Sequence, residues 1–169
     1  MTDAFYLSDI SNHIASMSAE MFEIANLKYD IIKFAKLCLT DSSIAKPFYS
    51  GIRDVSWCSA YSVLSEIEWT LGDKLQKSND GYCCNPPDVY WAGYLYGYWS
   101  RMYKDSPEDI WKYAPMERLL CVAPAYHTLD INLAIRILKE DYFMIKRKNK
   151  ELRKEGKEVT PSVFTQKRS

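Results

Sequence analysis

Apolar residues recur along most of this chain at intervals of three and four residues, the spacing that gathers side chains on one face of an α-helix. No stretch alternates between apolar and polar residues with a period of two, and the clusters of β-branched residues are too short for strands. The pattern predicts an all-α fold. We expect a compact bundle of six to eight helices around a central aromatic helix, with an extended basic helix or tail at the C-terminal end.

The densest aromatic stretch, residues 88–103, predicts a helix that is apolar on nearly all sides. Such a helix belongs at the centre of the bundle, and it is too short to span a bilayer, which requires about 20 apolar residues. Asp88 is expected to cap its N-terminus, because Pro86-Pro87 should stop the helix from extending backwards. Gly93 and Gly97 lie four residues apart, so another helix backbone is expected to approach them closely.

Residues 3–39 carry the longest helical pattern in the chain. Four positions recur every seven residues and are interleaved with Leu27 and Phe34. They are Met17, Ile24, Ile31 and Cys38. The pattern suits either a coiled-coil seam for a partner or a long helix laid across its own core, and we favour the second. The segment forms either one helix or two helices divided at residues 16–18.

Two further helices are predicted between residues 40 and 72. Residues 40–43 should stop the first long helix and cap a short one that ends at Phe48. Asp54 or Ser56 is expected to open the next helix, which Gly72 closes. Its expected core stripe consists of Trp57, Tyr61, Leu64, Ile67 (or Glu68) and Leu71. Residues 73–85 are polar and predict a loop without a binding site.

The clearest helix start is at residues 106–109, where a serine precedes a proline and two acidic residues. That helix is expected to end near Tyr113, and a short helix over residues 116–122 should end before Pro124. The last helix is predicted from Asp130 to Lys154, with a core stripe that stops at Ile145. We therefore predict one helical domain over residues 1–145 and a basic, partly disordered tail over residues 146–169.

Composition agrees with a single folded domain, since the chain has 169 residues and 47% of them are apolar. The formal net charge is zero, but the residues from Lys139 onward include ten basic and five acidic side chains, which predicts an acidic globule with a basic tail. The five cysteines are scattered and no secretory pattern opens the chain, which favours a reduced, cytoplasmic protein. Neither His13 nor His127 lies at ligand spacing from Cys83-Cys84, so no metal is expected.

The chain shows no catalytic motif. His127 and Asp130 are three residues apart and could meet at a helix start. The simpler interpretation is that Asp130 caps the helix while His127 packs or caps in the turn before it. Neighbouring carboxylates such as Glu66 and Glu68 do not converge on one helix face. We expect a protein that is not an enzyme and needs no cofactor.

Nucleic-acid binding is the alternative function from another class. Three short helices between residues 91 and 130 would allow an arrangement like a helix-turn-helix, with Arg118 on the helix in the recognition position. The tail adds basic residues that could contact phosphates. They are Lys146, Arg147, Lys148, Lys150 and Arg153. A single arginine on the recognition helix is meagre, so we expect weak, non-specific contact through the tail at most.

Residues 28–34 and three further groups of residues carry a resemblance to a known family, and the resemblance covers roughly residues 27–134. The three further groups are Trp91, Gly93, Tyr94, Tyr96 and Tyr98 in the aromatic helix; Ser106, Glu108, Asp109, Ile110 and Met116 at the following helices; and Tyr126, His127, Thr128, Leu129 and Asp130 in the last turn. In these positions the chain resembles a family of small, mostly uncharacterised proteins of Firmicutes and their mobile elements. Members are often encoded beside toxin-like proteins, some of the ADP-ribosyltransferase type, so the resemblance implies an antitoxin or immunity role. The chain departs from the family at Gly97, where a basic residue is usual, and has Arg101 one turn later.

The favoured function is therefore that of a protein-binding inhibitor, the antitoxin or immunity half of a toxin–antitoxin-like pair or a mobile-element inhibitor of a host system. Its partner would be a toxin or another target enzyme, and a homodimer is compatible with the sequence. The predicted partner-binding residues are Trp91, Tyr98, Arg101, Tyr126 and His127. A DNA-binding regulator of its own operon is the alternative, and no association with a membrane is expected.

Overall fold

The computed structural model describes residues 2–50, 58–78 and 83–159, with side chains from residue 9 onward. The chain divides into two units, Met1–Thr128 and Leu129–Ser169. The fold is all-α, as predicted, and the described segments contain eight α-helices and one 3-10 helix. These elements are α1 (Thr2–Lys28), α2 (Ile31–Thr40), α3 (Ser42–Tyr49), α4 (Ala60–Leu71), η2 (Gly72–Lys74), α5 (Pro86–Met102), α6 (Pro107–Tyr113), α7 (Met116–Tyr126) and α8 (Ile131–Lys154).

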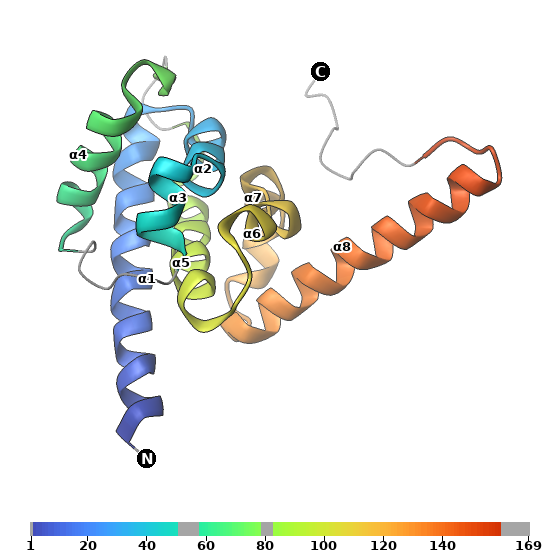
Figure 1. Cartoon of the computed structure of the whole chain (residues 1–169), viewed down its shortest axis with the longest axis horizontal. Helices are drawn as coiled ribbons and strands as arrows, with labels where there is room; N and C mark the ends of the chain where they lie inside the picture. Colours follow the sequence, from blue (N-terminus) through green and yellow to red (C-terminus); the bar gives the residue numbers. More distant parts are fainter. Residues whose placement is uncertain (1, 51–57, 79–82, 160–169) are drawn as a thin grey trace. The chain divides into compact units, whose positions relative to one another are not determined.

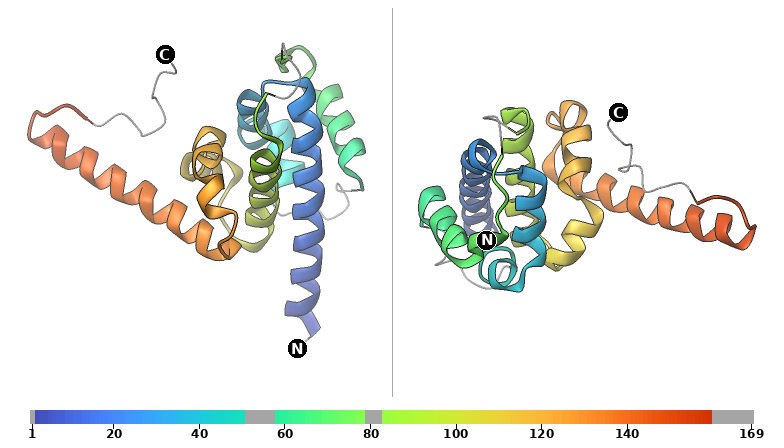
Figure 2. Two further views of the ribbon diagram at one scale, coloured as in Figure 1. Left: turned by 180° about the vertical axis from the view of Figure 1, so that it is seen from behind. Right: turned by 90° about the horizontal axis from the view of Figure 1, so that it is seen from above.

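The first unit is built on the close packing of α1 against α5, which run side by side in Figures 1 and 2. Gly93 and Gly97 of α5 face α1, as the sequence predicts. A Cβ atom added at Gly97 would lie 2.8 Å from the Cβ of Ser18 and 2.9 Å from the Cα of Ala15. A Cβ atom at Gly93 would lie 2.9 Å from the Cβ of Phe22. Only a residue without a side chain permits this approach.

The aromatic helix α5 is buried along most of its length, and its polar atoms are bonded inside the fold. The hydroxyl of Tyr96 donates to the carbonyl of Ala114 at 2.8 Å, and the indole of Trp99 donates to Asp105 at 2.8 Å. These bonds satisfy polar groups that would be costly to bury alone. The helix begins earlier than expected, because Pro86 and its neighbour occupy the first helical positions, where a missing N–H costs nothing. Asp88, the predicted cap, therefore lies in the first turn.

The long N-terminal pattern is divided into two helices at Tyr29 and Asp30, not at residues 16–18. The backbone of residues 28–30 pairs with the segment after η2: Asp30 N–H donates to Gln76 at 2.9 Å, and Ser78 N–H donates to Lys28 at 3.0 Å. Asp30 then caps α2 by accepting from the Lys33 N–H. The seven-residue repeat therefore continues across a break. Met17, Ile31 and Cys38 are buried, but Leu27, which was expected in the same pattern, is 48% exposed at the end of α1.

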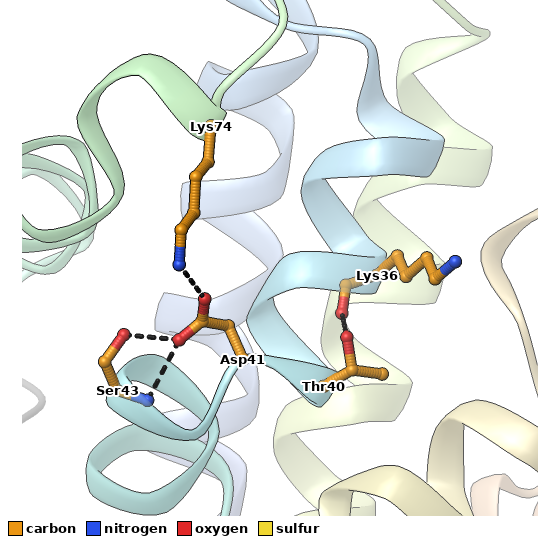
Figure 3. Close-up of polar contacts among 5 residues, drawn as sticks. All are labelled: Lys36, Thr40, Asp41, Ser43 and Lys74. Carbon is orange, nitrogen blue, oxygen red and sulfur yellow. Dashed lines mark hydrogen bonds and ion pairs between the residues drawn. The ribbon is translucent and has the colours of Figure 1, made fainter.

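Asp41 joins α2, α3 and η2, as Figure 3 shows. It follows α2 and caps α3, as predicted, by accepting from the backbone N–H and the hydroxyl of Ser43. Its second carboxylate oxygen lies 2.8 Å from the Nζ of Lys74 in η2. The bonds from Lys74 and Ser43 lower the pKa of Asp41 to about 2.

The helix α4 begins later than expected, at Ala60, and Gly72 closes it as predicted. Ser59 and Ser62 form a capping box at its start. Two residues, Asp54 and Ser56, were predicted as alternative starts of this helix, and Trp57 was predicted in its core. All three lie outside the described residues. The core stripe on α4 consists of Ala60, Val63, Leu64, Ile67 and Leu71. Tyr61 was expected in this stripe but is exposed, because it lies beside the stripe and shares a face of the helix with Ser65 and Trp69.

The helix start at Ser106 is as predicted, since the Ser106 hydroxyl accepts from the Asp109 N–H at 3.1 Å. The helix α7 does not end before Pro124 but continues to Tyr126. A proline in the last turn removes only the hydrogen bond of its own nitrogen, and the next turn closes when His127 N–H donates to Ala123 at 3.0 Å.

The second unit contains the helix α8, which spans Ile131–Lys154, so the basic segment up to Lys154 is helical. Asp130 caps it by accepting from the backbone N–H groups of Asn132 and Leu133. Gly156, with a φ of 67°, and the bond from Lys157 N–H to the Leu152 carbonyl end it. The predicted boundary at residue 146 therefore falls inside a continuous helix, and half-buried side chains continue beyond Ile145 to Leu152.

Candidate protein-binding surfaces

Three of the five predicted partner-binding residues lie on α5. Trp91 and Arg101 are half-buried. Tyr98 is only 7% exposed, and its ring stacks on that of Tyr94 with 6.3 Å between the centroids. Trp91 and Arg101 are ten residues apart on the helix, which separates them by about 15 Å along its axis. These residues therefore do not form one compact cluster, and Tyr98 belongs to the packed interior.

The other two predicted residues, Tyr126 and His127, end α7. Tyr126 is half-buried and His127 is exposed. The Nδ1 atom of His127 lies 2.9 Å from the carbonyl oxygen of Ala123, one helical turn earlier. The imidazole thus caps the C-terminus of its own helix, while Asp130 caps the N-terminus of α8. Each side chain has a local structural bond, in agreement with the simpler interpretation of the sequence.

Arg118, the predicted base-reading or phosphate-contacting residue, is buried with 4% exposure. Its guanidinium Nη1 donates to the carbonyl of Tyr113 at 3.1 Å and so bonds α7 to the end of α6. A guanidinium in this position stabilises the packing of the two short helices. It does not lie on a surface where a phosphate could reach it.

The basic residues predicted to contact nucleic acid through the tail lie on the second half of α8. All five are exposed: Lys146, Arg147, Lys148, Lys150 and Arg153. The ammonium of Lys146 lies 6.0 Å from the centroid of the Tyr142 ring, at the outer limit of a cation–π contact. The five basic residues form a positively charged segment of α8, which would attract a negatively charged partner, either a protein or a nucleic acid.

The most exposed large apolar side chains of the described structure lie on α4, which the sequence analysis did not single out. Trp69 is 90% exposed and Tyr61 is 72% exposed. Together with Ser65 they lie four residues apart on one ridge of the helix, and about 12 Å separates Tyr61 from Trp69 along the axis. We call these three residues the α4 ridge. Trp and Tyr are the residues most enriched at the energetic centres of protein interfaces.

The α4 ridge stands on a rigid support. The opposite face of α4 is buried, and Figures 1 and 2 show α4 along α1, on the side away from α5. Near the end of α4, Glu68 accepts from Lys28 Nζ at 3.1 Å and from the Tyr29 hydroxyl at 2.7 Å. Burial and the bond to Glu68 raise the pKa of Tyr29 to about 12. Trp69 follows Glu68 directly, so its backbone is fixed against α1.

A signal for the α4 ridge is present in the sequence. The core stripe runs through Leu64, Ile67 and Leu71, and Trp69 lies two residues from the nearest of these positions, on the other side of a helix. The position of an aromatic residue relative to the core stripe, and not its type, indicates whether its side chain is buried.

The described residues contain no cluster of three or more histidine, cysteine or acidic side chains that could hold a metal ion. Among the helices of the described residues, none is both long enough and apolar enough to cross a membrane. Cys83 and Cys84 do not form a disulfide with each other, and 3.9 Å separates their sulfur atoms. The side-chain amide of the buried Asn26 bonds both the N–H and the carbonyl of Cys84, at 3.0 and 2.8 Å. This pair of bonds gives the segment a structural role.

Comparison with models of protein families, with characterised proteins and with solved structures gave no match to this chain. The resemblance to the Firmicutes and mobile-element family therefore stays a prediction. Its motif residues have clear structural positions: Gly93 packs on α1, Ser106 caps α6, and Asp130 caps α8.

Proposed function

We propose that this protein is a protein-binding inhibitor, the antitoxin or immunity half of a toxin–antitoxin-like pair, and that it contacts its target through the α4 ridge. The observation that carries the proposal is the exposure of Trp69, at 90%, on a helix whose opposite face belongs to the core. An exposed tryptophan next to a second exposed aromatic residue favours burial in an interface.

The energetics support an interface of this kind. A tryptophan or tyrosine buries about 150–250 Å² when it enters an interface, and truncation of such a residue commonly costs about 2 kcal/mol or more of binding free energy. Ser65 between the two aromatic residues is small, so a partner backbone or side chain can enter between them. Because the ridge is held by a buried helix face, little conformational entropy is lost when it binds.

The acidic, hydroxyl and imidazole side chains of the types used in catalysis have structural roles here. Asp41, Ser106 and Asp130 are bonded to backbone N–H groups at helix starts. His127 is bonded to the end of its own helix. These groups stabilise helix ends, and that role accounts for their presence without a reaction.

A DNA-binding regulator remains the second candidate, and the observation that favours it is the exposed basic half of α8. The burial of Arg118 counts against sequence-specific recognition through α7. Binding through the lysines and arginines of α8 alone would depend on phosphate contacts, so it should be lost by about 0.2 M salt. A sequence-specific footprint at that salt concentration would favour the regulator.

The direct test uses the product of the gene adjacent to that of this protein. Expressed alone, that product should arrest the growth of a bacterial host, and co-expression of the wild-type protein should restore growth. The purified pair should form a complex that survives about 0.2 M salt, since an aromatic interface depends little on charge. A harmless neighbouring product, or growth arrest that persists in the presence of this protein, would contradict the antitoxin role.

A further inference from the structure

Four of the half-buried residues in the second half of α8 follow a seven-residue repeat. They are Tyr142, Ile145, Asn149 and Leu152, which continue from the buried Leu138 at intervals of four, three, four and three residues. Lys139 and Asp141 are also half-buried and lie beside this stripe. This alternation is the a/d pattern of a coiled coil, with Tyr142 and Asn149 at a positions and Ile145 and Leu152 at d positions. We call Tyr142, Ile145, Asn149 and Leu152 the α8 seam.

Asn149 gives the α8 seam an unsatisfied polar atom. Its side-chain Oδ1 is out of contact with solvent and has no hydrogen-bond partner among the described residues. An unpaired buried acceptor destabilises the fold, because it has lost its hydrogen bonds to water. An asparagine at an a position of a coiled coil pairs with a polar side chain of the facing helix and sets the register of the two. A facing helix would supply the missing donor once the Asn149 side chain turns outward from this inaccessible position.

Basic side chains flank the α8 seam. The e positions, next to the d residues, hold Lys139, Lys146 and Arg153, and the g positions hold Asp141 and Lys148. Residues 146–157 contain seven basic and two acidic side chains. A facing helix with acidic residues at its own e and g positions would form ion pairs along most of the seam.

A second copy of this chain fits the α8 seam less well. In a parallel pair, a g residue of one helix lies beside the e residue of the next heptad on the other. Lys148 of one copy would then face Arg153 of the other, and only Asp141 with Lys146 would attract. The excess of positive charge on both helices would oppose association.

We propose that the α8 seam binds an acidic amphipathic helix of a protein partner, with an asparagine or glutamine opposite Asn149. The inference rests on the proposed function, because this helix would belong to the inhibited protein or to its complex. It adds a second contact that is separate from the α4 ridge. The seam beyond Leu138 is only about two heptads long, so it should bind with a dissociation constant on the order of 10–100 μM.

The test is the binding of synthetic helical peptides to the full-length protein, followed by fluorescence anisotropy at about 0.15 M salt. The first peptide has about three heptads, with isoleucine at a, leucine at d, glutamate at e and g, and one central asparagine at a. The second has lysine in place of every glutamate, and a short DNA duplex is the third probe. The acidic peptide should bind at least about tenfold more tightly than either of the other two.

Two matched substitutions locate the contact. Ile145→Asp changes a d position, whereas Met144→Asp places the same charge on the adjacent, exposed side chain. We expect at least about tenfold weaker peptide binding for Ile145→Asp and less than about threefold for Met144→Asp. Equal effects of the two substitutions would overturn the proposed seam.

Asn149→Leu tests the polar pairing. This variant should bind the asparagine-containing peptide more weakly and should prefer a peptide with leucine at the same place, by at least about fivefold. An unchanged preference would show that Asn149 does not face the bound helix and would contradict the assigned register.

The remaining outcomes separate this inference from its competitors. Tighter binding of the DNA duplex than of the acidic peptide would replace the seam with a nucleic-acid surface. A dimer of the full chain that Ile145→Asp dissociates would replace the acidic helix with a second copy. Absence of peptide binding up to about 1 mM would overturn the inference and leave the proposed function standing, because growth rescue by the wild-type protein tests that function independently.

Discussion

The two helices that pack on opposite sides of α1 use the same kind of residue in opposite ways. In α5, Trp99 is fully buried and its indole donates to Asp105. In α4, Trp69 is 90% exposed. The two tryptophans differ in burial because the helices approach α1 differently. Gly93 and Gly97 let α5 lie directly on α1, and this close packing encloses the aromatic side chains of α5. Aromatic density therefore locates the core of this protein, whereas aromatic exposure locates its candidate binding surface.

The comparison predicts a large difference in stability between two tryptophan truncations. Trp99→Ala should lower the free energy of unfolding by about 3–5 kcal/mol, because it creates a cavity and leaves Asp105 without the indole donor. Trp69→Ala should change it by less than about 0.5 kcal/mol, since the side chain is exposed. Chemical denaturation of both variants measures the difference. A similar loss for the two would show that α4 is not oriented as described.

The close approach of α5 to α1 predicts the next largest effect. Gly97→Leu should destabilise the protein by about 3 kcal/mol or more, because its Cβ would lie within 2.9 Å of backbone and side-chain atoms of α1. Glu66→Leu on the exposed side of α4 is the control and should leave the melting temperature nearly unchanged. An unchanged melting temperature for Gly97→Leu would refute the packing of α5 on α1.

A smaller effect is expected at the surface junction of Asp41. Its pKa of about 2 in the folded protein is below the ordinary value of about 3.9, so its charge stabilises the fold above about pH 4 and this contribution is lost as the pH falls through 2. Asp41→Asn retains a capping side chain and removes the ion pair with Lys74. The cost should be about 0.5 kcal/mol at pH 7 and should vanish near pH 2.

Denaturation of Lys74→Gln and of the double variant supplies the control for Asp41. If the ion pair accounts for the effect, the double variant should be no less stable at pH 7 than either single variant. If the stability losses of the two single variants instead add up in the double variant, the low pKa of Asp41 would be due to its bonds with Ser43 alone.

Local signals in the sequence were sufficient for most helix ends. Ser106 and Asp130 cap the helices that they were expected to cap, and Gly93 and Gly97 lie where another helix comes close. The break after α1 could not be predicted in this way. Its cause is the pairing of residues 28–30 with residues 76–78, which are distant in the sequence, and the apolar repeat continues through the break.

The candidate surfaces were harder to predict than the fold. The five expected partner-binding residues were chosen for their type, and two of them, Tyr98 and His127, have structural bonds or packing that account for them. Trp69 and Tyr61 were overlooked or assigned to the core because an aromatic residue in a helix is usually buried. Whether it is buried depends on which helices pack around it, and that information is not local. The α8 seam was missed for a different reason, because Asn149 interrupts its apolar repeat.

The central claim is that the exposed tryptophan of α4 contributes to partner binding and not to folding. The decisive measurement is the dissociation constant of the complex with the product of the adjacent gene, for the wild-type protein, Trp69→Ala and the neighbouring control Thr70→Ala. We predict that Trp69→Ala binds at least about 30-fold more weakly, equivalent to about 2 kcal/mol, while it keeps the wild-type melting temperature, and that Thr70→Ala binds normally. Equal affinities for the wild-type protein and a folded Trp69→Ala variant would contradict the account.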